Sequence, residues 1–469
     1  MKRVAMACCV FGMIVSSLVL AQSASNAPRL KVSANHRWLQ YADGRPFFYL
    51  ADTSWHLFPN VTREQADLYL ANRAAKGFNV IQACVLNNVD DANAYGEKPL
   101  TDRDPAKPNE AYFRHVDYIV GKAQQLGLFI GMLPTWGSNW TRRHAKPPYV
   151  FTRDNARVYG NFLGSRYKNR PIIWILGGDE GIYSDEERAI IEALAAGLRE
   201  GDGGTHLITY HPRGPGRSSD YFAQGSILDF NMYQSSHGAH DHDNGLFADH
   251  DYGLQPPKPT VDGEARYETL PVGFYYPEAS KYDRFDDYDV RQAAYWSVLG
   301  GACGHAYGNN NLWQMWAPGR KPEIQPNMPW YDSLDHPGAF QMGIMRKLFE
   351  SRPFQKLVPE REVVANGPAY GGAKIRSERA DDGSFAFIYS PRGESFTVDK
   401  SRLKAPRLKE IWFDTRYGAS YHFHSTTNEG YQTYAPPTSG RGQDWLLILE
   451  DESANFPLPL DYKLSGTQN

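Results

Sequence analysis

Cysteine is scarce in this chain of 469 residues, which contains four cysteines. Two of them, Cys8 and Cys9, lie in an apolar N-terminal segment, so the remainder of the chain holds only Cys84 and Cys303. This scarcity excludes a disulfide framework, and a protein of this size must be held together by hydrophobic cores. Because distance along the chain does not show proximity, we favour two buried free thiols over one disulfide.

The sequence has no strong excess of charge of either sign. Its 50 Lys and Arg residues nearly balance its 53 Asp and Glu residues, which gives a formal net charge of -3. Proteins that bind polyanions need clustered positive charge. Nucleic acid is therefore not an expected partner.

Long hydrophobic runs are also missing, except at the N-terminus. The first residues combine a basic start at Lys2 and Arg3, an apolar run to about Leu20, and small residues around Ala21. This pattern predicts a signal peptide over residues 1–21 and not a membrane anchor. We expect a protein that is exported to the periplasm or the medium, with no membrane insertion.

Several motifs of common enzyme classes are absent from the chain. It contains no G-x-S-x-G nucleophile elbow, no phosphate-binding Walker loop, no H-E-x-x-H zinc motif and no G-x-G-x-x-G before a helix. The His-rich loop 235–253, with His237, His240, His242 and His250, matches neither zinc nor calcium spacing. We expect this loop to be solvated or to cover a substrate, and we expect neither metal nor cofactor.

What the sequence does contain is a repeated unit of strand, loop and amphipathic helix. We predict helices over 62–77, 109–127, 154–170, 184–201 and 286–301. Eight strands are predicted at 47–55, 78–86, 128–136, 171–179, 206–212, 228–236, 259–268 and 301–310. This alternation is typical of the α/β class and predicts a (β/α)8 TIM barrel over residues 30–353. The fifth and sixth helices are weakly marked, so an open sheet is the alternative.

The pattern changes after Arg352 and Pro353. Short alternating segments follow, separated by turn residues at intervals of about ten. They predict a C-terminal antiparallel β-sandwich domain over residues 355–460.

The fourth predicted strand, PIIWILGGDE, ends in two glycines and two acids. Side chains alternate along a strand, so Ile173, Ile175, Gly177 and Asp179 share the face that we assign to the barrel interior. The glycines leave room for another group to approach the backbone. We expect Asp179 at the rim of the barrel, with Glu180 turned toward the loop to hold a neighbour.

The seventh predicted strand, TVDGEARYE, places Asp262 and Glu264 on one face and ends where Glu264 emerges. Carboxylates that end the fourth and seventh strands would meet across one pocket at the C-terminal rim. Hydrolysis of a glycosidic bond with retention needs such a pair, one as proton donor and one as nucleophile. We therefore predict Asp179 as the acid and Glu264 as the nucleophile.

The other strand ends supply groups that suit a sugar. Asp229, Asn231 and Tyr233 alternate with Phe230 and Met232, and we predict that the polar set faces the cavity. Aromatic faces stack on sugar rings and short polar side chains bind hydroxyls. The predicted substrate-binding residues are Asp52, Trp55, Trp136, Glu180, Tyr210, His211, Asn231, Tyr233, His305, Tyr307 and Asn309.

Several segments, in this order, resemble the apiosidase-like glycoside hydrolases: RPFFYLADTSWHLF, KGFNVIQ, GLFIGMLPTWG, RPIIWILGGDE, VDGEARYE and GHAYGNNNLWQ. The resemblance covers nearly all of the chain after the signal peptide. It implies a (β/α)8 catalytic domain followed by a β-sandwich of the type labelled collagen-binding. By position it assigns Asp179 as acid/base and Glu264 as nucleophile, and apiose-containing pectin side chains are one substrate class of the family.

Taken together, the sequence predicts an exported, retaining glycoside hydrolase that acts on plant or microbial polysaccharide or oligosaccharide without a cofactor. One alternative is a non-catalytic carbohydrate-binding or cell-surface protein on a glycosidase-like barrel, although such a protein would be expected to have lost one of the acids. The second alternative is an inverting hydrolase, whose carboxyl groups stand farther apart.

Overall fold

The computed structural model describes residues 27–143, 147–223, 226–461 and 463. The predicted signal peptide, residues 1–21, lies outside the described residues. Within the described part of the chain, no helix is long and apolar enough to cross a bilayer.

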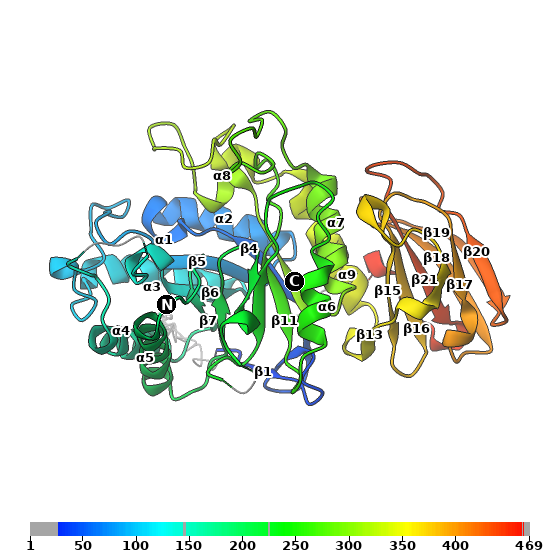
Figure 1. The fold of residues 1–469 in the computed structure, drawn as a ribbon, viewed down its shortest axis with the longest axis horizontal. Helices are drawn as coiled ribbons and strands as arrows, with labels where there is room; N and C mark the ends of the chain where they lie inside the picture. The colour runs from blue at the N-terminus through cyan, green and yellow to red at the C-terminus, as the bar shows by residue number, and fades with distance from the viewer. Residues whose placement is uncertain (1–26, 144–146, 224–225, 462, 464–469) are drawn as a thin grey trace, which may run out of the picture.

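The larger part of the molecule is a barrel of parallel strands surrounded by helices (Figure 1). Each of the eight predicted strands is present, and neighbours in the sequence are neighbours in the barrel. The parallel strands are β4 (Tyr49–Thr53), β5 (Val80–Leu86), β6 (Phe129–Thr135), β7 (Ile172–Gly177), β8 (Ile208–His211), β10 (Asn231–Gln234), β11 (Thr260–Glu264) and β12 (Gly304–Tyr307). A small antiparallel sheet precedes them, formed by β1 (Leu30–Val32), β2 (Leu39–Tyr41) and β3 (Pro46–Phe47).

The helices that cover the barrel begin at the positions that the sequence marks. Thr62, Thr152 and Asp286 each accept a hydrogen bond from the third residue of their helix, as a capping side chain does. The helices of the barrel are α1 (Leu57–Asn60), α2 (Arg63–Ala75), α3 (Glu110–Gln125), α4 (Arg153–Tyr167), α5 (Asp185–Asp202), α6 (Gly245–Tyr252), α7 (Asp287–Val298), α8 (Asn310–Trp313) and α9 (Pro337–Glu350).

The two faces of a barrel strand pack into two different hydrophobic cores. Ile173 and Ile175 of β7 belong to the core inside the barrel, as predicted. Trp174 and Leu176, on the other face of the same strand, pack with the surrounding helices. Both faces of a parallel strand are therefore buried, which is why these strands read as continuous apolar runs.

The barrel is nearly closed, and its weakest contact lies between β8 and β10. These two strands form no regular ladder, but the amide of Asp229 donates to the carbonyl of Ile208 over 2.8 Å, and Thr209 Oγ1 donates to the carbonyl of Phe230 over 2.8 Å. Between them the chain forms β9 (Gly216–Arg217) and the 3-10 helix η3 (Ser218–Asp220) where a regular barrel has its fifth α-helix. The predicted TIM-barrel class is confirmed, with this irregular seam.

Antiparallel strands follow the barrel and form two sheets. The larger sheet has the order β13-β15-β16-β21-β18-β19, and the smaller one has the order β14-β17-β20. Their strands are β13 (Leu357–Pro359), β14 (Val364–Asn366), β15 (Arg376–Ala380), β16 (Phe385–Ser390), β17 (Phe396–Asp399), β18 (Arg407–Asp414), β19 (Ser420–Thr427), β20 (Tyr431–Tyr434) and β21 (Trp445–Asp451).

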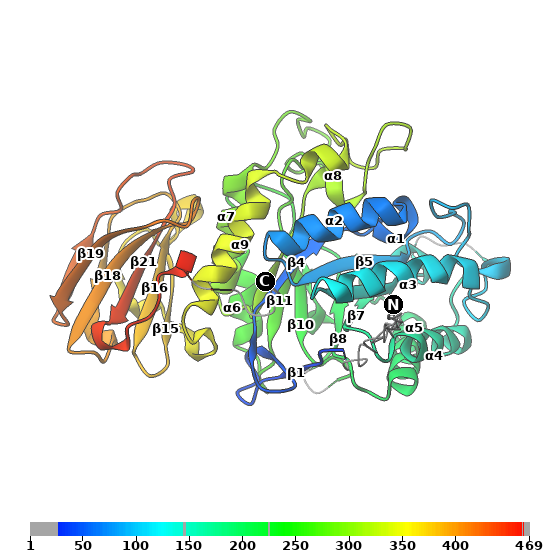
Figure 2. The same ribbon diagram turned by 180° about the vertical axis from the view of Figure 1, so that it is seen from behind.

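The β-sandwich packs on the barrel through a continuous apolar core. Figures 1 and 2 show its larger sheet beside α7 and α9. Tyr295 of α7 stacks on Tyr389 of β16 with ring centres 4.8 Å apart, and Phe349 of α9 meets Phe387 edge-on at 5.3 Å. The barrel interior and this interface belong to the same cluster of buried residues. The two parts of the molecule therefore share one core.

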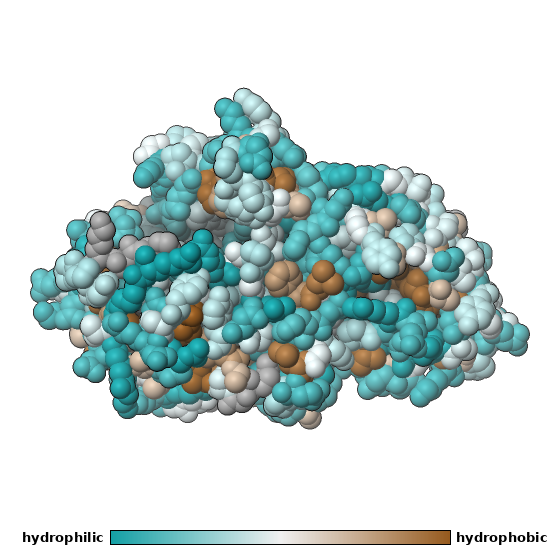
Figure 3. All heavy atoms as spheres, viewed as in Figure 1, coloured by the Kyte–Doolittle hydropathy of each residue, from teal (hydrophilic) through white to brown (hydrophobic). Residues whose placement is uncertain are grey.

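The surface in the view of Figure 1 is mostly polar, with apolar residues in small separate patches (Figure 3). Cys84 and Cys303 are both buried and form no disulfide. The free-thiol interpretation is therefore confirmed.

Candidate active site

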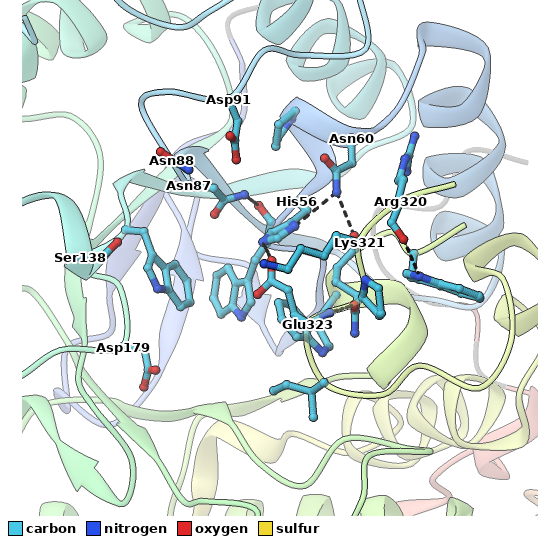
Figure 4. A pocket seen from close by; sticks show the side chains of 18 of the residues that line it. His56, Asn60, Asn87, Asn88, Asp91, Ser138, Asp179, Arg320, Lys321 and Glu323 are labelled. Atoms are coloured by element: carbon cyan, nitrogen blue, oxygen red, sulfur yellow. Dashed lines mark hydrogen bonds and ion pairs between the residues drawn. The ribbon is translucent and has the colours of Figure 1, made fainter. Parts of the chain in front are cut away.

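A cavity of about 1140 Å³ opens at the C-terminal ends of the barrel strands. Its walls come from the segments that follow the strands, including loop 87–94 after β5 and segment 313–324 after β12. Figure 4 shows Asp179 on one side of this hollow and Arg320, Lys321 and Glu323 on the other. The predicted position at the C-terminal rim is the one at which barrel enzymes hold their active sites.

Asp179 reaches the cavity because the chain turns sharply after β7. Gly177 and Gly178 both have φ of 90°, and Asp179 itself has φ of 59°. A Cβ on Gly177 would lie 2.3 Å from the carbonyl oxygen of His211, so only glycine allows this close approach. The turn directs the Asp179 side chain into the cavity.

The second predicted acid, Glu264, ends β11 and lines the same cavity. His237 Nε2 lies 3.0 Å from its Oε1, and His211 Nε2 lies 3.0 Å from its Oε2. Only 7% of Glu264 is exposed, so its carboxylate is largely shielded from water. The carboxylate is thus held from both sides.

His211 connects the two carboxyl-bearing segments. The backbone amide of Asp179 donates to His211 Nδ1 over 3.2 Å, so Nδ1 acts as an acceptor. In a neutral imidazole the other nitrogen must then carry the hydrogen. This tautomer places an N–H at Nε2, the atom that faces Glu264.

The environment separates the acidities of the two carboxyl groups. Burial, together with the negative charge of Glu264, raises the pKa of Asp179 from 3.8 to about 7. Burial also acts to raise the pKa of Glu264, but His211 and His237 more than offset it and lower this pKa to about 2. At neutral pH the site can therefore hold one carboxyl group protonated and the other ionised, as acid and nucleophile require.

Aromatic rings surround the carboxyl pair. Trp55 lies edge-on to His211 at 5.2 Å and 5.5 Å from Trp136, and both tryptophans line the cavity. Farther along the cavity, Trp313 meets His56 edge-on at 5.4 Å. Rings of this kind offer apolar faces on which sugars stack.

Of the residues that the sequence predicts to bind substrate, Trp55 and Trp136 line the cavity. His211 lies directly behind it, in contact with Glu264. Glu180 is turned toward the loop, with Oε1 3.9 Å from Arg213 Nη1. The remaining predicted residues lie elsewhere.

Asp52 and Tyr307 point away from the cavity, which corrects the prediction for both. Asp52 accepts a hydrogen bond from Tyr69 over 2.6 Å and lies 3.3 Å from Arg73, both on α2. Tyr307 donates to Glu268 over 2.5 Å in the core. Each satisfies a buried polar group beneath the rim.

The prediction is also wrong for His305 and Asn309. His305 is 1% exposed and lies 3.9 Å from Asp262, which itself accepts a hydrogen bond from Ser297 of α7. Asp262 therefore faces the helices and does not share the face of Glu264. Asn309 caps α8 by accepting from the amide of Asn311 over 3.0 Å.

In β10 the predicted phase is reversed. Phe230 and Met232 belong to the core inside the barrel, and Tyr233 stacks on Phe247 of α6 at 5.6 Å. Asn231 is buried outside the cavity. The same alternation continues from Met232 to the rim of the barrel. Gln234, which we did not predict, lines the cavity instead.

Tyr210 likewise faces outward. Its hydroxyl donates to the carbonyl of Glu180 over 2.5 Å, and its ring packs on Phe222 at 5.1 Å. Its role is to hold the turn that carries Asp179, so the prediction that it binds substrate is corrected.

Several cavity residues were missed by the sequence argument. His237 lies in the His-rich loop, and Tyr267, whose ring is 4.8 Å from that of His237, follows β11. His56, Trp313 and Lys321 also line the cavity. The sequence carried one signal for them, because most of these residues lie within a few positions of the end of a barrel strand.

In the described part of the chain, no group of three or more His, Cys, Asp or Glu residues is arranged to hold a metal ion.

Comparison with known proteins assigns both parts of the chain. Residues 33–356 match the family model described as "Apiosidase-like, catalytic domain", and residues 358–450 match one described as "Putative collagen-binding domain of a collagenase". No curated protein matches the chain.

Two solved structures are similar over nearly the whole chain. One is described as a glycoside hydrolase, with 34% identity and a TM-score of 0.83, and the match covers 91% of this chain and 97% of that one. The other is a family 5 glycoside hydrolase from Bacteroides vulgatus, with 30% identity and a TM-score of 0.84, and here the coverage is 92% and 97%.

Proposed function

The chain belongs to the apiosidase-like glycoside hydrolases, and from this premise we propose that it acts with retention, with Asp179 as acid and base and Glu264 as nucleophile. In the first step, Asp179 gives its proton to the glycosidic oxygen while a Glu264 oxygen attacks the anomeric carbon. The bond to the leaving alcohol breaks and an ester to Glu264 forms.

In the second step, the ionised Asp179 takes a proton from water, whose oxygen attacks the anomeric carbon as the ester bond to Glu264 breaks. The charge of Glu264 is absent in the ester, so one cause of the raised pKa of Asp179 is removed. Asp179 can then act as a base where it first acted as an acid.

The observation that carries this proposal is the opposite shift of the two carboxyl groups in one cavity, to about 7 for Asp179 and about 2 for Glu264. The two imidazoles that lower the pKa of Glu264 also make it a good leaving group in the second step. Family membership and the presence of both acids favour an enzyme over a non-catalytic carbohydrate-binding protein.

The stereochemistry of the product tests the mechanism. Proton NMR of the first-formed sugar should show the anomer of the substrate, whereas the opposite anomer would establish inversion.

Asp179→Asn and Glu264→Gln should each lower kcat by about 10³-fold or more while the fold is kept. Folded variants as active as wild type would refute these roles.

We further propose that the substrate is a plant or microbial polysaccharide or oligosaccharide, with apiose-containing pectin side chains as one candidate. The support is family membership together with a cavity large enough for more than one sugar ring. Pectic, hemicellulosic and arabinan oligosaccharides should be screened with the purified enzyme, and release of apiose from pectic side chains would establish that class.

We also propose that residues 1–21 direct export and are removed after Ala21. The support is the sequence pattern of a basic start, an apolar run and small residues. N-terminal sequencing of the protein from periplasm and medium should give Gln22 first, and retention in the cytoplasm would refute the proposal.

A further inference from the structure

A second hollow, of about 270 Å³, lies in the β-sandwich. It is formed between β18 and β19 of the larger sheet and β20 of the smaller one. These strands lie at the end of the molecule remote from the barrel (Figures 1 and 2). The hollow is therefore separate from the catalytic cavity.

Glu410 is the unusual residue of this hollow. Its neighbours on the same face of β18, Leu408 and Trp412, belong to the sandwich core. A carboxylate at such a position is costly to bury unless it is hydrogen-bonded. Glu410 is nevertheless only 6% exposed, so neighbouring groups must compensate the burial of its carboxylate.

The surrounding side chains hold this carboxylate in one orientation. Oε1 accepts from Thr426 over 2.6 Å and from the Tyr434 hydroxyl over 2.8 Å. Oε2 accepts from Gln432 over 3.3 Å, and Lys400 Nζ in turn donates to Gln432 over 2.9 Å. Because its one bond is long, Oε2 keeps capacity to accept a further hydrogen bond from the hollow.

Two aromatic rings complete the wall. Trp412 and Tyr434 both line the hollow and are 7% and 5% exposed. Thr433, Ala435 and His424 form its more exposed rim. An apolar ring beside a fixed carboxylate and short polar groups is the combination that binds one face and the hydroxyls of a sugar.

We propose that this hollow is a non-catalytic binding site for one uncharged sugar ring of a polysaccharide. Its volume lies just below the range of about 300–1000 Å³ typical of sites for drug-sized ligands, which suits one ring. The Glu410 carboxylate accepts from hydroxyl groups and repels an acidic sugar. A proline-rich or collagen-like chain advances about 3.1 Å per residue and needs an extended groove, which a single small hollow does not provide.

The position of the hollow would let it keep a polymer near the catalytic cavity. Because the sandwich and the barrel share one core, a sugar bound here holds the catalytic cavity at a fixed offset along the same polymer. Attachment at a second point raises the effective concentration of substrate at the first. The site would therefore assist action on polymers and leave action on small glycosides unchanged.

The binding test uses the full chain labelled with 15N-tryptophan, with the Trp412 indole signal assigned through Trp412→Phe. D-galactose, D-glucose, D-xylose and L-arabinose are added separately up to the high millimolar range. At least one should shift the Trp412 signal saturably, and D-galacturonate should bind more weakly than D-galactose. The tryptophans of the catalytic cavity report separately, so this result does not depend on whether the proposed reaction occurs.

Matched variants at one position make the test specific. Ala435→Arg should fill the hollow and abolish the shift, whereas Ala435→Ser should keep it. Glu410→Gln should weaken binding by about tenfold, as expected for loss of one charge-assisted hydrogen bond. The proposal is overturned if no sugar shifts Trp412, if Ala435→Arg binds as wild type does, or if only a Gly-Pro-Pro repeat peptide produces the shift.

Discussion

Two carboxyl groups in one cavity have opposite acidities because their immediate neighbours differ. Asp179 has the charge of Glu264 near it and receives little compensation, whereas Glu264 has an imidazole at each oxygen. Burial penalises both ions, so the histidines decide which group ionises first. In the proposed mechanism, His211 and His237 thus determine which group acts as the acid and which as the nucleophile.

The pH dependence of kcat/KM follows from these values. Asp179 must be protonated to act as the acid, so the rate should fall as pH rises through about 7. Glu264 must be ionised, so on the acid side the rate should persist toward about pH 2, as far as the fold allows. A rate that stays constant well above pH 7 would contradict the role of Asp179. Glu180→Gln should keep the alkaline limb, which tests the neighbouring acid.

Asp179→Asn should stabilise the folded protein at neutral pH. The pKa of Asp179 is higher in the folded state than in the unfolded state. The free energy of unfolding therefore decreases as pH rises from about 3.8 through about 7. At about 1.4 kcal/mol per pKa unit, the amide should recover at most about 4 kcal/mol. Urea unfolding should show a larger gain at pH 8 than at pH 5. Asp91→Asn, at the exposed rim of the same cavity, should show no such gain, and an equal gain would contradict the argument.

His237 is a positioning residue whose role can be separated from folding. His237→Ala removes the group facing Glu264 Oε1, so the pKa of Glu264 should rise and the acid limb of the pH profile should move to higher pH. We expect kcat/KM to fall about tenfold. His237→Gln, whose amide can donate, should restore part of the rate. His242→Ala, in the same loop, should leave the acid limb in place, and an unmoved limb in His237→Ala would refute the role.

Residue orientation was the least predictable feature of the site. Both faces of a parallel strand are buried, so a run such as DFNMY does not reveal which phase faces inward. Glu264 was correctly placed in the cavity, although the face that it was expected to share with Asp262 does not exist. The reason is a bulge in β11, where Gly263 is an extra residue opposite β10 and places Asp262 and Glu264 on opposite faces.

At the scale of elements, the turn after β7 is the most constrained part of the site. Gly177 and Gly178 allow the backbones of His211 and Gly137 to approach, as the two adjacent glycines indicated. The conformation that they adopt is what delivers Asp179 to the cavity.

Gly177→Ala should therefore be far more harmful than an ordinary glycine substitution. The new Cβ would lie 2.3 Å from the carbonyl oxygen of His211, in addition to the strain of φ at 90°. Gly44 has a φ of 97° and open space around it, so Gly44→Ala should cost only about 1–2 kcal/mol. We expect a loss of more than about 3 kcal/mol for Gly177→Ala in urea unfolding. Equal losses for the two variants would show that backbone strain alone matters.

The presence of most elements could be predicted because their signals are local. The eight strands are short segments of buried side chains, and the five predicted helices begin at capping side chains at, or within two residues of, the predicted positions. The fifth connection has no amphipathic period, and the chain there forms β9 and η3. Weak periodicity was thus a correct sign of an irregular element.

At the scale of the whole molecule, the β-sandwich forms part of the structure that supports the barrel. Arg291 of α7 is 1% exposed and forms two contacts with Asp444, at 2.5 and 2.8 Å. The sequence could not reveal this pairing, because the partners are 153 residues apart. The predicted domain limits near residues 353–355 stay a prediction.

Loss of one interface charge should accordingly weaken the entire protein. Arg291→Ala leaves Asp444 buried without its cation, which typically costs about 3–5 kcal/mol. Arg361→Ala removes an exposed partner of Asp249, which keeps its contact with Arg376, and should cost at most about 1 kcal/mol. Unfolding followed by fluorescence and by circular dichroism should give one coincident transition in both variants. Two separate transitions would show that the sandwich folds independently.

The irregular seam between β8 and β10 has a consequence for how the protein fails on heating. A ring of strands comes apart first where the fewest hydrogen bonds join neighbours, and here that place adjoins His211 at the end of β8. Small openings at this joint would release the imidazole that contacts Glu264 while the remaining strands stay paired. Catalysis should then decline some degrees before the molecule melts.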